Sequence, residues 1–145
     1  MNESEVIDFE TFEKEKEIKE KEKNTIKIFL TLSDFNYILR LYLSEKKNSI
    51  IFKLENESAL SHFYFEKFFL NDFHQKNRIF MIDCSITQIL LHIKKLIVKS
   101  EIVLERKEKN NIIVIIKSEL DKYKLNFDLK KIILTQNQFN LKLVE

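Results

Sequence analysis

Residues 85–98 constrain this 145-residue chain more than any other stretch. Their apolar side chains recur at the spacing of a single helical face, and Ser85 with Gln88 has the spacing of a capping box. Lys94, Lys95 and Lys99 occupy the last turns, where cations suit the helix dipole. Short alternating segments lie on both sides of this stretch. We therefore expect one amphipathic helix packed against a β-sheet.

Seven segments alternate apolar and polar residues, as strands with one buried face do. They cover residues 25–32, 37–44, 49–54, 61–67, 102–106, 112–117 and 123–129. Residues 69–77 have helical spacing and predict a second, shorter helix, and residues 79–82 are expected to form a buried link between the helices. The predicted fold class is α+β: a small seven-stranded antiparallel β-barrel or sandwich with a helix-turn-helix inserted between strands 4 and 5.

Glycine and proline are both absent from the chain. A Walker A loop, a GxGxxG dinucleotide turn and a GxSxG nucleophile elbow all require glycine, so these classes of site are excluded. Turns that need positive φ must use Asn, Asp or Ser, and in the hairpin at residues 107–111 we expect the asparagines to do so. The single cysteine, Cys84, cannot close an internal disulfide.

Nothing in the sequence predicts membrane association. The longest apolar run covers residues 112–116, whereas a bilayer span needs about 20 residues. Glu3, Glu5 and Asp8 make an acidic start that is unlike the basic head of a signal peptide.

Composition divides the chain into three parts. Residues 1–24 mix Glu and Lys with few apolar side chains and predict a charged flexible tail. Val6, Phe9 and Phe12 nevertheless recur at a spacing of three, which leaves a short docking helix as an alternative. Residues 25–131 form the β-barrel domain. Residues 132–145 form a C-terminal segment, either a further strand or the candidate start of a coiled coil.

The two halves of the chain differ in charge. Residues 1–75 carry a net charge of −4 and residues 76–145 carry +6. Basic and apolar side chains on the last hairpins form a candidate partner surface, made of Arg106, Lys107, Lys109, Lys117, Leu120 and Lys124. Such a surface suits an acidic protein partner, or alternatively nucleic acid.

The sequence offers no pattern for a metal, a cofactor or a reaction. His62, His74, His92 and Cys84 match no zinc-ligand spacing. Cys84 lies just before the helix and His92 is a conceivable base, yet there is no glycine loop to build an oxyanion hole. We expect no catalytic residue, no metal, no cofactor and no small-molecule substrate.

The order of elements carries a resemblance to a known family. An acidic and aromatic run covers residues 63–73, and an apolar run at residues 79–82 ends at Asp83. The helix at residues 86–97 comes next, followed by the strand-like residues 101–117 and 123–129. This arrangement resembles the head domain shared by the centriolar cartwheel assembly protein and the non-homologous end-joining scaffold proteins. The resemblance covers approximately residues 26–129.

That resemblance implies a non-enzymatic, intracellular scaffold module, cytoskeletal or centriolar, with protein partners and self-association. In such a family the heads meet through a hydrophobic side chain at a late hairpin tip and a coiled coil pairs the chains. Leu120 is the only apolar residue at the two candidate tips, and Phe139 and Leu143 are the candidate oligomerisation residues. Sustained heptads over three or more repeats do not fit before Glu145. The alternative is a nucleic-acid-associated scaffold domain of the end-joining type that uses the basic C-terminal half.

Overall fold

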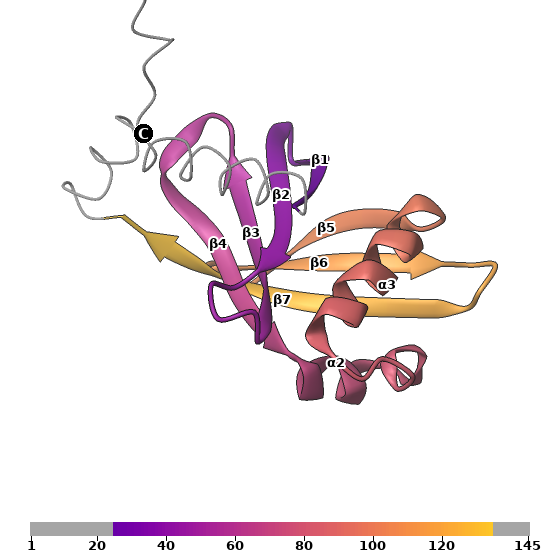
Figure 1. Cartoon of the computed structure of the whole chain (residues 1–145). Helices are drawn as coiled ribbons and strands as arrows, with labels where there is room; N and C mark the ends of the chain where they lie inside the picture. Colours follow the sequence, from indigo (N-terminus) through magenta and orange to yellow (C-terminus); the bar gives the residue numbers. More distant parts are fainter. Residues whose placement is uncertain (1–24, 135–145) are drawn as a thin grey trace, which may run out of the picture.

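The computed structural model describes residues 25–134, in which seven strands form one antiparallel sheet (Figure 1). The strands are β1 (Ile26–Leu32), β2 (Phe35–Leu43), β3 (Ser49–Asn56), β4 (Ala59–Phe69), β5 (Glu101–Lys107), β6 (Asn111–Ser118) and β7 (Tyr123–Ile133). Their order in the sheet is β1-β2-β3-β4-β7-β6-β5, and the two edge strands, β1 and β5, contact each other. The sheet is thus a nearly closed barrel, which confirms the predicted fold class.

The two predicted helices and an additional 3-10 helix connect β4 to β5. They are α2 (Leu70–Lys76), the 3-10 helix η2 (Arg78–Phe80) and α3 (Ile86–Val98). Figure 1 shows α2 continuing from the end of β4 and α3 running from there toward the start of β5. The predicted apolar stripe of α3 has six residues. Five of them are buried, namely Ile86, Ile89, Leu90, Ile93 and Leu96, and the sixth, Ile97, is partly buried.

Alternation along each strand places one set of side chains inside the barrel. In β2 the predicted apolar face of Tyr37, Leu39 and Leu41 is buried. In β7 the same holds for the alternating residues Tyr123, Leu125, Phe127 and Leu129. Since a strand's side chains have a period of two, the remaining positions of these strands point outward.

The two hairpin groups, β1–β4 and β5–β7, join at a short seam. β4 pairs with β7 over four residue pairs only, from His62 with Ile133 to Phe65 with Lys130. The last part of β4 is not paired with β7, and aromatic side chains fill the space between the strands. The Phe127 ring lies 4.5 Å from Phe52 and 5.3 Å from Phe68, centroid to centroid.

The glycine-free turns use polar and charged residues at positive φ. Ser33 and Asp34 form the two-residue β1–β2 loop with φ of 51° and 67°, as a type I′ turn requires. In the β5–β6 hairpin the register of Lys107 with Asn111 leaves residues 108–110 as the loop, and the left-handed residue is Glu108, with φ of 58°. The expectation that asparagines take this conformation in the hairpin is therefore wrong.

The link at residues 79–82 is only partly buried. Phe80 is fully buried, whereas Met81 and Ile82 are 59% and 79% exposed. The backbone N–H of Met81 donates to the Arg78 carbonyl at 3.0 Å, and the N–H of Asp83 donates to the Phe80 carbonyl at 3.0 Å. Because these tight turns direct Phe80 and, in part, Ile79 toward the core, the prediction of a buried link is wrong for Met81 and Ile82.

The predicted chain ends fall largely outside the described residues. This applies to the tail at residues 1–24 and to Phe139 and Leu143. β7 continues to Ile133, past the predicted boundary at residue 131, and the backbone N–H of Leu134 donates to the Ser61 carbonyl at 2.9 Å. Among the helices of residues 25–134, none has the length and apolarity to cross a bilayer.

The side chains of Ser85 and Gln88 cap the N-terminus of α3. The Ser85 hydroxyl accepts a hydrogen bond from the Gln88 backbone N–H at 3.2 Å, and the Gln88 side chain accepts from the Cys84 N–H at 2.6 Å. The Ser85 half of the predicted capping box is present, whereas the Gln88 side chain accepts from the N–H of Cys84, one residue before the N-cap, and not from that of Ser85.

We expect Ser85→Ala to lower the free energy of unfolding by about 1 kcal/mol, because the Gln88 N–H loses its acceptor. Urea denaturation followed by far-ultraviolet circular dichroism measures this. Ser85→Asp is the matched control and keeps the stability close to that of the unchanged chain, since aspartate caps equally well. Equal stability of Ser85→Ala and the unchanged chain would contradict this account of the cap.

Candidate functional site

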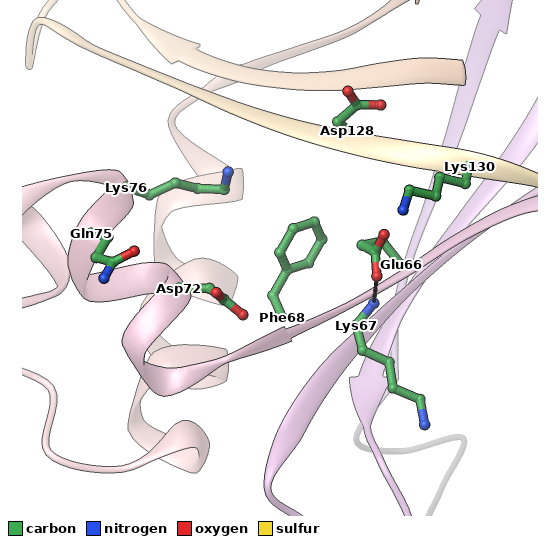
Figure 2. A pocket seen from close by; sticks show the side chains of 8 residues that line it. All are labelled: Glu66, Lys67, Phe68, Asp72, Gln75, Lys76, Asp128 and Lys130. Carbon is green, nitrogen blue, oxygen red and sulfur yellow. Dashed lines mark hydrogen bonds between the residues drawn. The ribbon is translucent and has the colours of Figure 1, made fainter. Parts of the chain in front are cut away.

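A cleft opens where β4 and β7 separate, beside α2. It has a volume of about 510 Å³. Its lining is mostly charged and comes from these three elements: Glu66, Lys67, Phe68, Asp72, Gln75, Lys76, Asp128 and Lys130 (Figure 2). The lining thus contains three carboxylates and three lysines around the ring of Phe68, and Figure 2 shows the Lys67 side chain pointing away from the other charged groups.

Lys76 is the most perturbed group in this cleft. Its ammonium lies 5.3 Å from the centroid of the Phe68 ring and 4.9 Å from that of Phe127. Burial lowers the pKa of Lys76 below its ordinary value, and the nearby carboxylates of Asp72 and Asp128 oppose this effect. The two rings both desolvate the charge and attract it through their faces, so the shift has a structural cause.

Asp128 is held at one oxygen only. Its Oδ2 accepts a hydrogen bond from Lys107 Nζ at 3.0 Å, while the buried Oδ1 has no partner among the described residues. Asp72 caps α2 by accepting from the Phe69 backbone N–H at 2.7 Å. The cleft thus contains carboxylates with structural roles, and its lining has neither a histidine nor a hydroxyl or thiol nucleophile.

The histidines and the cysteine form no joint site. His92 Nδ1 lies 2.7 Å from Asp83 Oδ2, and His74 Nε2 lies 2.8 Å from the Asp83 carbonyl oxygen. Cys84 is exposed, with its Sγ 3.8 Å from the Ile82 carbonyl. Asp83 is buried, so these contacts join α2, the link and α3. Within residues 25–134 no three His, Cys, Asp or Glu side chains are grouped for metal binding.

The structure divides the predicted partner surface between opposite ends of β6. Lys107 and Lys109 lie at the β5–β6 turn, whereas Lys117, Leu120 and Lys124 lie around the β6–β7 turn. Lys117 pairs with Glu101 at 3.9 Å across the β5–β6 ladder. The six residues are therefore not one continuous patch, and their binding to a partner stays a prediction.

Arg106 belongs to the inner face of its strand. It hydrogen-bonds to the phenols of Tyr64 and Tyr37, and this raises the pKa of the guanidinium above its ordinary range. Arg106 shares strand parity with Ile102 and Leu104, which is the signal that could have separated it from the lysines.

The β6–β7 tip presents an apolar corner of the molecule. Leu120 is 91% exposed at the tip, and Val98 at the end of α3 is 87% exposed. Lys99 Nζ lies 2.9 Å from Asp121 Oδ2, so an ion pair joins the residue after Val98 to the residue after Leu120. The Ser118 hydroxyl also accepts from the Asp121 backbone N–H at 3.2 Å. Leu120 is therefore carried by a braced turn.

The sequence did not predict the cleft because one of its walls comes from β7, whose Asp128 and Lys130 reach residues 66–76 only through long-range pairing. Glu66 and Asp128 come from strands whose contact depends on the short β4–β7 seam. No local spacing connects them. The sequence did identify Leu120, because an apolar residue in a charged turn stands out.

Together, fold and sites define a small antiparallel β domain with an inserted helix pair. No family model matches the sequence, and no curated protein matches it either. Among solved structures, an N-terminal fragment of Drosophila melanogaster Sas-6, a variant dimerised via the coiled-coil domain, superposes with a TM-score of 0.49 at 10% identity. The match covers 83% of this chain and 68% of that chain. A likeness of this size does not assign the chain to a family.

We expect the Lys76 side chain to titrate below the ordinary lysine pKa of 10.5, because the rings desolvate its charge. Asp128→Asn lowers this pKa further, since it removes a carboxylate that favours the ammonium. The unfolded chain then binds the proton more tightly, so the contribution of Lys76 to stability improves as pH rises through the folded pKa. Side-chain nuclear magnetic resonance against pH measures both values. A midpoint at or above 10.5 in the unchanged chain would contradict the burial argument.

Proposed function

We propose that this chain is a non-enzymatic protein-interaction module that self-associates through the apolar corner at the β6–β7 tip. The observation that carries the proposal is Leu120, a large apolar side chain that is 91% exposed on a turn braced by the Lys99–Asp121 pair. Bracing favours association because a pre-ordered contact loses little conformational freedom on binding.

One leucine supports only a weak contact. Full burial of its side chain is worth about 1.5–3 kcal/mol, whereas a dissociation constant of 1 mM already needs about 4 kcal/mol. Val98 adds apolar surface to the same corner. A second contact between the same chains would raise the affinity by avidity, and Phe139 and Leu143, outside the described residues, stay the predicted residues for it.

The charged cleft supports a non-enzymatic function rather than an enzymatic one. Its perturbed lysine is explained by two aromatic rings, and its carboxylates cap α2 or pair with Lys107. The cytoskeletal or centriolar setting implied by the sequence resemblance, and an intracellular location, remain part of the proposal.

The nucleic-acid alternative is less well supported at the predicted surface. Lys107 pairs with Asp128 and Lys117 with Glu101, so acidic neighbours offset part of the positive charge on these hairpins. Binding to phosphates requires cations that are available to release counterions.

We expect the weight-average mass of the unchanged chain to rise with protein concentration in light scattering, and Leu120→Asp to shift that rise to higher concentration. A charge buried at the contact without a partner opposes association. Ile82→Asp is the matched control, since Ile82 is 79% exposed at the other end of α3. It leaves the association unchanged.

Two results would contradict the proposal. One is a strictly monomeric chain at every concentration. The other is an association that Leu120→Asp and Ile82→Asp weaken equally. Circular dichroism of both variants confirms that the fold is retained, as expected for substitutions at exposed positions.

A further inference from the structure

One cross-strand row on the outward face of the barrel collects an unusual number of cations. Lys27 in β1 lies opposite Arg40 in β2, Arg40 opposite Lys53 in β3, Lys53 opposite Phe65 in β4, and Phe65 opposite Lys130 in β7. We call these five residues the basic row. Directly opposed like charges destabilise a sheet, and the row contains two such pairs in succession.

Acidic side chains compensate this row only in part. At the outward positions of β1–β4, within residues 25–134, Glu55 is the only carboxylate. Its Oε1 lies 2.5 Å from Arg40 Nη1 and 4.0 Å from Lys53 Nζ. Lys130 lies in the cleft beside the carboxylates of Glu66 and Asp128. Lys27, Arg40 and Lys53 with Glu55 therefore keep a net charge of +2, which an anionic occupant would neutralise.

An exposed apolar row runs beside the basic row. Phe29 is 67% exposed and lies opposite Ile38, and Ile132 is 39% exposed on β7 opposite Phe63. Glu55 of β3, between Ile38 and Phe63, is the one charged residue of this row. The Lys27 ammonium lies 5.6 Å from the centroid of the Phe29 ring. An occupant that fits both rows is acidic on one side and apolar on the other.

The chain contains such a segment in the sequence before β1. Residues 2–13 carry five acidic side chains and no basic one, and Val6, Phe9 and Phe12 recur among them. Their charge of −5 complements the +2 of Lys27, Arg40, Lys53 and Glu55. We propose that residues 2–13 of the same chain bind across the outward face of β1–β4 and β7, with their acids on the basic row and their apolar residues on the row of Phe29.

The connection is long enough for this contact. β1, at one edge of the face, begins at Ile26, and the eleven residues 14–24 precede it. Eleven extended residues reach about 36 Å. The five strands from β1 to β7 are separated by four steps of about 4.8 Å, or about 19 Å in total. Residues 2–13 can therefore reach every strand of the row.

The test places a nitroxide at residue 4 of the full chain, as Ser4→Cys with Cys84→Ser, and measures amide signals by nuclear magnetic resonance. The expected result is a loss of intensity at Lys27, Arg40 and Lys53, relative to the reduced label, with no loss at Val103 and Asn126 on the outward side of β5–β7. Equal loss on both sides, or no loss on either, would overturn the proposal.

A matched pair of charge variants tests the role of the acids. Glu5→Lys, Asp8→Lys and Glu10→Lys together restore the intensities. Glu15→Lys, Glu17→Lys and Glu20→Lys change the net charge of the chain by the same amount outside the proposed segment, and the loss persists. The same response to both triple variants would overturn the proposal.

Two further samples test whether a second copy of the chain or a nucleic acid occupies this face instead. A mixture of isotope-labelled chain without nitroxide and unlabelled chain with nitroxide reports contacts between copies. Loss at the basic row in that mixture, as large as in the single sample, would assign the face to a second copy instead. In the second sample a single-stranded oligonucleotide is titrated into the unchanged chain and into the triple variant at Glu5, Asp8 and Glu10. Equal affinity for the two chains would show that residues 2–13 do not occupy the face. Either result overturns the proposal but leaves the Leu120 contact untouched.

Discussion

The ring cluster around Phe127 holds the two parts of the barrel together. Phe127 of β7 lies 4.5 Å from Phe52 of β3, 5.3 Å from Phe68 of β4 and 5.9 Å from Phe73 of α2, centroid to centroid. β4 and β7 share only four residue pairs, so backbone hydrogen bonds at this seam are few. Edge-to-face and tilted ring contacts add about 0.5–1.5 kcal/mol each to the burial of the rings themselves. The inserted helix pair therefore belongs to the seam, because Phe73 of α2 and Phe80 of η2 extend the same cluster.

The same cluster determines where charge can lie. Rings that separate β4 from β7 leave the cleft beside α2, and Lys76 is desolvated because it lies over two of them. With the large apolar side chains directed inward, the outward positions of β1–β4 carry the cations of the basic row. The exposed apolar side chains that remain, such as Leu120 and Phe29, are then the natural candidates for contacts outside this core.

Periodicity predicted the elements well because each strand buries one face and α3 buries one stripe. Tyr37 to Leu41, Tyr123 to Leu129 and the box of Ser85 with Gln88 are all local patterns. Features that depend on register could not be predicted in the same way. The alignment of Lys27 with Arg40 and Lys53 follows from two hairpin registers, and the cleft follows from the seam between strands far apart in sequence. Glu108 is the left-handed residue of the β5–β6 turn because the pairing of Lys107 with Asn111 makes residues 108–110 the loop, whatever conformation these residues prefer.

The ring cluster makes both hairpin groups a single cooperative unit. The direct test is urea unfolding of the full chain, followed by methyl signals of Leu39 in β2 and Val114 in β6, both fully buried. Coincident transitions are the signature of two-state unfolding, and the account predicts that both signals disappear with one midpoint. Separate midpoints, with one hairpin group losing its native signal while the other retains it, would contradict the claim.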